Sequence, residues 1–375
     1  MENLAPKTRL YDLVIRRLEE TRRTFDACCG TLGAVVITDN SYLISCDWGT
    51  SAFRLRLLQG TESPKILAER STSRGIATFS AGEVDEFQNY LILELDRLFR
   101  SARRSPEPIP VYLSGMITST LGWKELPYAE LPFPLEGSRA IVARTVLQRV
   151  YGNHALVFFS GVKSADDVLR GEETELLGII QDPELRKWHK SSVVLLPGTH
   201  SKVIELENRA IAGFRTYLTG ELFQVLRRNS ILRHSVDVEP EKDELAWELF
   251  RSGVERARQS GLMESLFTVR SNVLLKRIPP SVNTFYLSGL LIGAEVASVH
   301  NRYPSPRSII LGGTRKLQEL YHCAFQVLND SSRVHLVSEE VTSIASALGH
   351  WSLRAVVEND SVGFTRQESQ TQSDP

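Results

Sequence analysis

ISCDWGTSAFRLRLLQGTESPKILAERST (Ile44 to Thr72) and VVLLPGTHSKVIELENRAIAGFRTYLT (Val193 to Thr219) are two copies of one local pattern in a chain of 375 residues. Each copy places a Gly-Thr turn between two apolar runs and a polar turn before a third run. Alternating apolar residues are typical of half-buried strands, and Gly or Asn at a reversal is typical of hairpins. The sequence therefore predicts two three-stranded antiparallel meanders, and a repeat on this scale indicates two similar lobes.

The two Gly-Thr turns predict phosphate binding. A glycine lets the backbone approach a phosphate closely, and successive N–H groups and a hydroxyl can then point at its oxygens. The residues at these turns are Gly49, Thr50 and Ser51 in the first copy and Gly198, Thr199 and His200 in the second. Either turn alone could be an ordinary hairpin, because Asp and Gly are common turn residues. A matched pair favours a nucleoside triphosphate held between two lobes.

Two further features extend this hypothesis. Asp47 ends a buried strand directly before the first Gly-Thr turn, where a carboxylate can hold Mg²⁺ beside a phosphate, through water. A third turn, Gly312, Gly313 and Thr314, follows the predicted strand SIIL and is suited to lie against a ribose or an α-phosphate. Taken alone, this third motif could be only a turn.

The segment RGEET, Arg170 to Thr174, predicts the catalytic group. Phosphoryl transfer needs a carboxylate that accepts the proton of the attacking hydroxyl, and a cation that offsets charge on the transferred group. The sequence offers Glu172 as the base, Glu173 as its alternative and Arg170 as the cation. The competing interpretation is a solvated first helical turn, where acidic residues are favoured by the helix dipole.

The loop SGMITSTLGWKELPY predicts a small-molecule pocket. Trp123 and Tyr128 can stack on a sugar, while Ser114 and Lys124 can hydrogen-bond its hydroxyl or carboxylate groups. For Trp123, sealing a core is an equally good interpretation.

Composition limits the partners. The chain carries 44 Lys and Arg against 45 Asp and Glu, and these charges are interleaved, so no nucleic-acid partner is expected. The four cysteines have no metal-ligand spacing, which favours reduced thiols in a cytoplasmic protein. No run reaches the roughly 18 apolar residues of a membrane span, and the start resembles no signal peptide, so no membrane association is expected. A homo-oligomer is possible.

The expected organisation has four parts. Residues 1–40 form an extension with an accessory amphipathic helix, for which an organelle presequence is the alternative. Residues 41–175 and 176–357 form the two lobes, and residues 358–375, rich in Ser, Gln and Asp, form a disordered tail. Strands that alternate with helices predict an α/β fold with mixed sheets flanked by helices.

Three helices carry specific expectations. Ser80 to Glu83 is a capping box before a helix whose buried face includes Val84, Phe87, Leu91, Leu95 and Leu98. Thr219 is expected to cap a helix carrying Leu222, Val225 and Leu226. The stretch Phe285 to Val299 is apolar nearly all round and predicts a central buried helix.

Six strings in this order resemble the 2-keto-3-deoxygalactonokinase family, within the superfamily of acetate and sugar kinases, heat-shock proteins and actin. They are CDWGTSAFR, SGMITSTLGWKELPY, RGEETELLG, PGTHSKV, FRTYLTGEL and YLSGLLIGAE, and the resemblance spans about Tyr42 to Val356. It implies two ribonuclease-H-like lobes that clasp ATP, and ATP- and Mg²⁺-dependent phosphorylation of the 6-hydroxyl of 2-dehydro-3-deoxy-galactonate. It also implies phosphate contacts at the first two Gly-Thr turns, an adenosine contact at the third, and a base at Glu172.

Two departures and three alternatives accompany this resemblance. The extension has no counterpart in typical family members, and could reflect a misassigned start codon. Leu196 stands where many sugar kinases of the superfamily have an Asp, so metal ligation would fall mainly on Asp47. The alternatives are a kinase for a related 2-keto-3-deoxy sugar acid, a phosphotransferase or hydrolase acting on polyphosphate, and a catalytically silent nucleotide-binding switch. One stereocentre separates the galactonate-derived acid from its gluconate epimer, and the sequence does not distinguish them.

Overall fold

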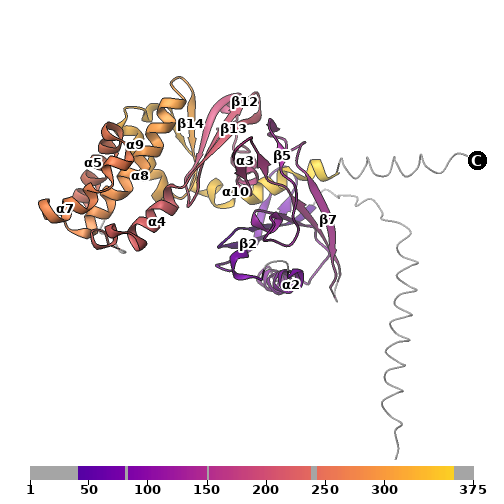
Figure 1. The fold of residues 1–375 in the computed structure, drawn as a ribbon. Helices are drawn as coiled ribbons and strands as arrows, with labels where there is room; N and C mark the ends of the chain where they lie inside the picture. Colours follow the sequence, from indigo (N-terminus) through magenta and orange to yellow (C-terminus); the bar gives the residue numbers. More distant parts are fainter. Residues whose placement is uncertain (1–40, 81–82, 150–151, 238–242, 359–375) are drawn as a thin grey trace, which may run out of the picture.

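The computed structural model describes residues 41–80, 83–149, 152–237 and 243–358. Two six-stranded sheets with flanking helices form two lobes (Figure 1), which confirms the predicted fold class. The expected accessory helix at 1–40 and the tail from residue 359 lie outside the described residues.

The first lobe is built on the sheet β3-β2-β1-β4-β8-β7. Its antiparallel meander is β1 (Ser41–Trp48), β2 (Phe53–Gly60) and β3 (Lys65–Thr72), as predicted. β4 (Val111–Ser114) runs parallel to β1, β8 (His154–Phe159) runs parallel to β4, and β7 (Val142–Leu147) is antiparallel at the edge. A small sheet, β10-β9-β5, contains Val168–Leu169, Val162–Lys163 and Ala129–Glu130.

Helix α2 (Val84–Ser101) covers one face of this sheet and buries the predicted Phe87, Leu91, Leu95 and Leu98. The predicted capping box is wrong in its register, because the helix begins at Val84, which is exposed. The backbone N–H of Ser80 donates instead to the carboxylate of Glu86, at 3.1 Å. The acidic partner of the cap therefore lies three residues later than the sequence pattern suggests.

The second lobe repeats the arrangement in the sheet β15-β14-β11-β12-β13-β6. The meander is β11 (Ser191–Leu196), β12 (Ser201–Glu207) and β13 (Ala210–Tyr217), followed across the sheet by parallel β14 (Ser308–Leu311) and β15 (Val334–Leu336). The two lobes thus share one strand plan, which confirms the repeat. β6 (Phe133–Pro134) comes from the first half of the chain but pairs with β13.

Helices cover the second sheet. They are α4 (Thr219–Asn229), α5 (Glu244–Ser260), α6 (Leu262–Ser265), α7 (Thr268–Lys276), α8 (Pro280–Arg302) and α9 (Arg315–Val327). By length and composition α8 could cross a membrane, but 78% of its most apolar window is buried inside the protein, as in a core helix. The predicted central buried helix is therefore confirmed. Short 3-10 turns lie at Ile76–Thr78, Met116–Thr118, Arg186–Trp188, Ile231–His234 and Ser331–Arg333.

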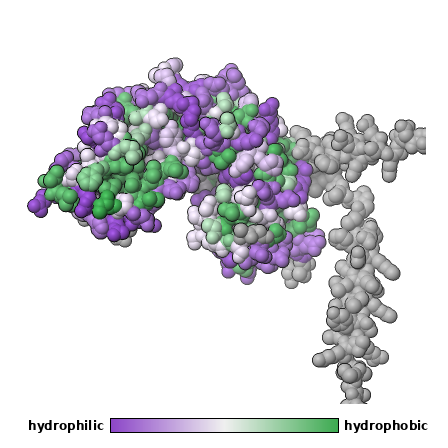
Figure 2. All heavy atoms as spheres, in the orientation of Figure 1, coloured by the Kyte–Doolittle hydropathy of each residue, from purple (hydrophilic) through white to green (hydrophobic). Residues whose placement is uncertain are grey.

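Helix α4 differs from its prediction. The residue before the helix is Leu218, so Thr219 is its first residue rather than its cap, and the Thr219 hydroxyl donates to Glu295. Leu222 and Val225 are 39% and 45% exposed, whereas Leu226 packs against the core of this lobe, so the expected apolar residues of α4 are only partly covered. Figure 2 shows apolar surface over the part of this lobe where Figure 1 places α4 and α7.

Two helices join the lobes. α3 (Glu172–Ile179) and α10 (Glu339–Ser352) cross between the sheets, and one apolar core takes residues from both sheets and both helices. Gly178 of α3 lies against the backbone of α10, and Gly349 of α10 lies against the backbone of α3. The boundary expected at residue 175 falls inside α3, and α10 packs on β1 of the first lobe.

Candidate active site

The first Gly-Thr hairpin joins β1 to β2, and backbone hydrogen bonds from the 3-10 turn at Ile76–Thr78 hold it in place. The backbone N–H groups of Ile76 and Ala77 donate to the carbonyls of Gly49 and Thr50, each at 3.0 Å. The outer side of the hairpin, at Thr50 and Ser51, is exposed. Its backbone is therefore held in shape while its hydroxyl groups remain accessible.

Asp47 and the start of α3 lie close together because two glycines let their chains approach. The Asp47 carboxylate is 22% exposed and accepts from Arg54 at 3.1 Å. Gly115 has a φ of +90°, and a Cβ on it would lie 2.9 Å from the carbonyl oxygen of Trp48 and 3.5 Å from Asp47 Oδ1. A Cβ on Gly171 would in turn lie 3.3 Å from the Cα of Gly115. Ser114, which pairs with Asp47 in the sheet, has a buried Oγ with no hydrogen-bond partner among the described residues.

The two candidate bases occupy different environments. Glu172 Oε2 accepts from the backbone N–H of Arg170 at 2.9 Å, and its side chain is 27% exposed. Its other oxygen lies 3.5 Å from Lys202 Nζ on β12 of the second lobe. Glu173 is buried, and its carboxylate accepts from the backbone N–H of Gly171 at 2.8 Å. Accessibility therefore favours Glu172 as the group that meets a substrate.

Two carboxyl groups near the start of α3 have raised pKa values. Burial, with a smaller contribution from nearby carboxylates, raises the pKa of Glu173 and of Glu175 to about 7; the neighbour is Glu172 for both, and also Asp47 for Glu175. A charged carboxyl loses its hydration on burial, so the proton is held more strongly.

Glu173→Gln is expected to make the fold less sensitive to alkaline pH. Because the pKa of Glu173 is raised from 4.5 to about 7 on folding, the native state binds more protons than the unfolded state between these values. Stability contributed by the protonated carboxyl is present below the unfolded pKa and lost as pH rises toward 7. The variant should therefore gain roughly 1–3 kcal/mol over the wild type at pH 8 relative to pH 5. Urea unfolding at both pH values measures this gain, and an equal difference at both would contradict it.

A set of polar contacts between the lobes, made by Lys202 and Asp167, was not predicted from the sequence. Lys202 Nζ donates to Thr216 Oγ1 at 2.8 Å and to the carbonyl of Val168 at 3.3 Å, while it also faces Glu172. Asp167 of the first lobe accepts from both the backbone N–H and the hydroxyl of Thr216, at 2.6 and 2.9 Å. Lys202 is 7% exposed, so a cation is buried at the joint. In the sequence it is one residue of a strand, and only the cross-lobe contact reveals its place.

Arg170 holds the predicted substrate loop. Its guanidinium donates to Thr118 Oγ1 at 2.8 Å, to the carbonyl of Leu126 at 3.4 Å and to Tyr128 Oη at 3.1 Å. It also lies over the Tyr128 ring, 4.0 Å from the centroid. These contacts place Arg170 behind the loop, and its predicted contact with a transferred phosphoryl group stays a prediction.

The other loop residues are divided between core and solvent. Trp123 is half-buried and its ring meets Phe158 edge-on, with centroids 5.5 Å apart. Lys124 is exposed. Trp123 thus seals part of the first core, while Lys124 remains accessible.

The second Gly-Thr hairpin is packed against the start of α4. A Cβ on Gly220 would collide with the carbonyl of Gly198 and lie 2.8 Å from the Cα of Thr199. The backbone N–H of Glu221 donates to the Thr199 carbonyl at 2.9 Å, and its carboxylate is hydrogen-bonded to His200. His200 therefore has a carboxylate partner at the hairpin tip.

The third turn adjoins the second hairpin. The backbone N–H of Gly312 donates to the Leu195 carbonyl at 2.9 Å. Gly313 has a φ of +85°, and a Cβ there would lie 3.2 Å from Pro197 Cδ, while Thr314 is exposed at the start of α9. The structure thus brings two of the three predicted phosphate or nucleoside turns together in the second lobe.

Figure 2 shows an open notch between the lobes, bordered by the surfaces where Figure 1 places α4 and β2. The first hairpin leads into β2, and the second packs on the start of α4. Among the described residues no hydrogen bond or ion pair joins the two hairpins. Each hairpin therefore adjoins an element that borders this notch.

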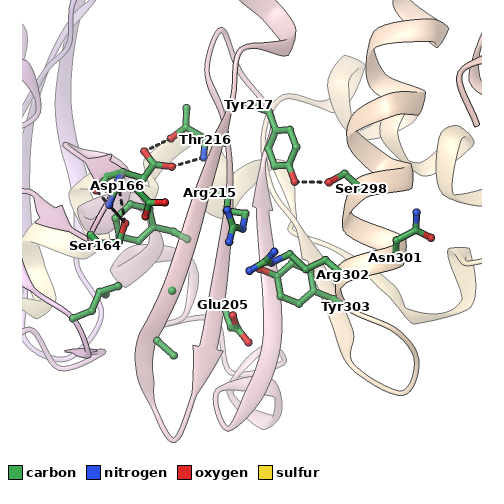
Figure 3. Close-up of a pocket in the computed structure, with 16 residues that line it drawn as sticks. Ser164, Asp166, Glu205, Arg215, Thr216, Tyr217, Ser298, Asn301, Arg302 and Tyr303 are labelled. Atoms are coloured by element: carbon green, nitrogen blue, oxygen red, sulfur yellow. Dashed lines mark hydrogen bonds between the residues drawn. The ribbon is translucent and has the colours of Figure 1, made fainter. Parts of the chain in front are cut away.

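A separate groove of about 910 Å³ runs along β13 (Figure 3). Its lining includes Asp167 and Thr216 on one side, and Tyr217 and Ser298, whose hydroxyls lie 2.9 Å apart, on the other. Neither the three Gly-Thr turns nor Asp47, Arg170 and Glu172 line this groove. The groove therefore runs beside the contact between Asp167 and Thr216 that joins the lobes.

The residues around Asp47 fit a magnesium ion with a single protein carboxylate. Asp47 is accessible, and only its Oδ2 is occupied by Arg54. No cluster of three or more His, Cys, Asp or Glu suited to a metal occurs within the described ranges. Magnesium commonly binds through one or two carboxylates, with phosphate oxygens and waters completing its shell.

Two repeated lobes, each with a Gly-Thr hairpin, are joined by two crossing helices and define a two-lobed α/β class of protein. The family model described as 2-keto-3-deoxy-galactonokinase matches residues 47–347, so the chain belongs to this family. The family resemblance drawn from the sequence is confirmed.

Individual relatives agree. The chain is 32% identical over 298 residues to the probable 2-dehydro-3-deoxygalactonokinase DgoK1 of Rhizobium meliloti, covering 77% of this chain and 90% of the relative. It is 30% identical over 291 residues to the 2-dehydro-3-deoxygalactonokinase of Escherichia coli, covering 76% of this chain and 89% of the relative. A crystal structure of a candidate 2-dehydro-3-deoxygalactonokinase from Sinorhizobium meliloti superposes with a TM-score of 0.68 and 31% identity, covering 84% of this chain and 99% of that chain.

Proposed function

We propose that this protein is an ATP-dependent kinase that phosphorylates the 6-hydroxyl of 2-dehydro-3-deoxy-D-galactonate. The observation that carries the proposal is the pair of matched Gly-Thr hairpins, one in each lobe, in a chain that belongs to the 2-keto-3-deoxygalactonokinase family. The named activity of the two curated relatives supports the substrate. A cytoplasmic location and a homo-oligomer stay predictions.

In the proposed reaction, the substrate hydroxyl attacks the γ-phosphorus in line as Glu172 accepts its proton, and the bond from phosphorus to the β,γ-bridging oxygen breaks to release ADP. The hydroxyls of Thr50 and Thr199 donate to phosphate oxygens. Asp47 would hold Mg²⁺, which when bound offsets charge on the phosphates. Gly312, Gly313 and Thr314 face the adenosine side, with Ser51, Gly198 and His200 completing the phosphate contacts.

The acceptor is proposed to bind at the loop held by Arg170. The unpartnered hydroxyl of Ser114 lies at the end of β4, next in the sheet to Asp47. A buried hydroxyl without a partner is costly, and Ser114 stays the predicted contact for a substrate hydroxyl. Lys124 is accessible for the substrate carboxylate, and Tyr128 and Trp123 supply ring surface.

ADP release measured with and without purified sugar acids tests the function. Release only with acceptor supports a kinase, release without acceptor indicates a hydrolase, and no release under either condition indicates a silent nucleotide-binding relative. Comparing 2-dehydro-3-deoxygalactonate with its gluconate epimer then fixes the substrate. A preference for the gluconate-derived acid would overturn the proposed acceptor while leaving the phosphotransferase intact.

Gly49→Ala and Gly198→Ala are expected to weaken ATP binding without unfolding the protein. A Cβ at Gly49 would meet no atom closer than 3.7 Å, and at Gly198 none closer than 3.9 Å, while neither has a positive φ. Packing within the protein therefore does not require glycine at either position, and alanine should hold or slightly raise stability. A methyl group facing a phosphate should instead raise KM for ATP by roughly tenfold or more.

Steady-state kinetics and thermal melts of both variants check this expectation. Gly75→Ala is the matched control, because its Cβ would collide with the backbone of the first hairpin and should lower the melting temperature. An unchanged KM for ATP in both hairpin variants would remove the phosphate role of these glycines.

A further inference from the structure

A buried carboxylate in the second lobe is connected to the second hairpin. Glu295 of α8 is 2% exposed and accepts a hydrogen bond from Tyr321 Oη at 2.7 Å. Tyr321 Oη lies 3.0 Å from Ser201 Oγ, which accepts from the backbone N–H of Gly198 at 3.4 Å. The chain of contacts thus runs from the interior of the helical layer to the first residue of the Gly-Thr turn.

The same carboxylate reaches the hairpin from a second side. Glu295 Oε2 also accepts from the hydroxyl of Thr219, the first residue of α4. The next residue, Gly220, packs directly on Gly198 and Thr199. Glu295 therefore ties together the strand that leaves the hairpin and the helix start that supports it.

The burial of Glu295 without a counter-ion is not expected to stabilise the fold. Burial raises the pKa of Glu295 to about 7, while hydrogen bonds from Thr219, Tyr321 and Ser201 oppose that rise. Tyr321 is the only titratable group that faces it among the described residues, and no lysine or arginine there contributes to its pKa. Its second oxygen, Oε1, is buried without a hydrogen-bond partner in the described part of the chain. A buried carboxyl with no counter-ion normally destabilises a protein, so its presence calls for another role.

We propose that Glu295 is a positioning residue that fixes the second Gly-Thr hairpin for the phosphates of ATP, through Tyr321 and Ser201 on one side and Thr219 on the other. This inference rests on the proposed function, because it assumes that the hairpin binds phosphate. Glu295 touches no reacting atom, and its effect is on nucleotide affinity rather than on the transfer step. Loss of the carboxylate loosens the hairpin before binding, and part of the binding free energy is then spent on ordering it.

Titration calorimetry with the non-hydrolysable analogue AMP-PNP and Mg²⁺ tests the inference without any sugar acid. Glu295→Gln keeps the shape of the side chain but weakens it as a hydrogen-bond acceptor, and Tyr321→Phe removes one link only. Each variant is expected to bind AMP-PNP roughly tenfold more weakly, as for loss of one hydrogen bond to a charged group. The double variant should lose no more affinity than Glu295→Gln alone, because the Tyr321 link is one of the two routes by which Glu295 reaches the hairpin.

The accompanying kinetics separate positioning from general damage. At saturating ATP and acceptor, kcat of both variants should stay within about threefold of the wild type, while KM for ATP rises with the dissociation constant. Glu130→Gln, at a 70% exposed side chain paired with Lys163, is the matched control and should change neither value. Wild-type affinity in the well-folded Tyr321→Phe variant would overturn the inference, even if Glu295→Gln fails to fold. A wild type that binds no AMP-PNP would instead overturn the proposed function.

Discussion

Asp47→Asn should lower turnover by roughly three orders of magnitude while leaving the fold intact, since metal-assisted charge stabilisation is worth several kcal/mol in the transition state. The amide keeps the size of the side chain but carries no charge for Mg²⁺. The fold should tolerate the change, because the ion pair lost within the described residues is the partly exposed contact with Arg54.

Initial rates over a range of MgCl₂ concentrations measure this effect. Arg54→Gln is the control, since it removes the same ion pair and keeps the carboxylate, and it should change turnover by less than about threefold. If purified Asp47→Asn retained near-full rate at low Mg²⁺, the assignment of the metal to Asp47 would be wrong.

Glu172→Gln is expected to lower kcat by about 10²- to 10⁴-fold, the usual contribution of a general base, with little change in KM for ATP. Glutamine can still accept from the backbone N–H of Arg170, so the start of α3 should keep its geometry. Lys202 then faces a neutral partner, which the melting temperature of the variant would report.

The matched experiment on Glu173→Gln decides between the two neighbouring carboxyls. Glu173 is buried and bonded to the helix start, so its replacement should affect stability more than turnover. The opposite result, with Glu173→Gln inactive and Glu172→Gln active, would move the base to Glu173. Glu184→Gln, at an exposed position away from the site, controls for the loss of one surface charge.

Local patterns predicted much of the fold. Both meanders and the buried helix α8 were identified because alternation and uniform apolarity are properties of the segment itself. The pairing of β6 with β13 was not, since two residues carry no strand pattern and the partner lies far along the chain. The exposed face of α4 shows a related limit, because an amphipathic sequence cannot say whether a neighbour covers its apolar side.

The site divides in the same way. The Gly-Thr turns and RGEET carry their chemistry in adjacent residues, so the sequence offered them directly. Thr219 resembled a helix cap because a hydroxyl precedes Gly220, but the carboxylate of Glu295 competes successfully for that hydroxyl. Lys202 and Glu295 became candidates only through partners on other elements, and no local spacing marks them.

The crossing of α3 and α10 constrains how the two halves can move. Gly178 and Gly349 bring the two helix backbones into direct contact, with no side chain between them at these positions. The crossing is therefore a natural pivot point for a rotation of one lobe relative to the other. Rocking about that point keeps the shared apolar core closed, whereas sliding would force each helix over the flanks of its neighbour. Because Glu172 begins one of these helices, a rocking motion would swing the opposite wall toward it while the carboxylate itself travels little.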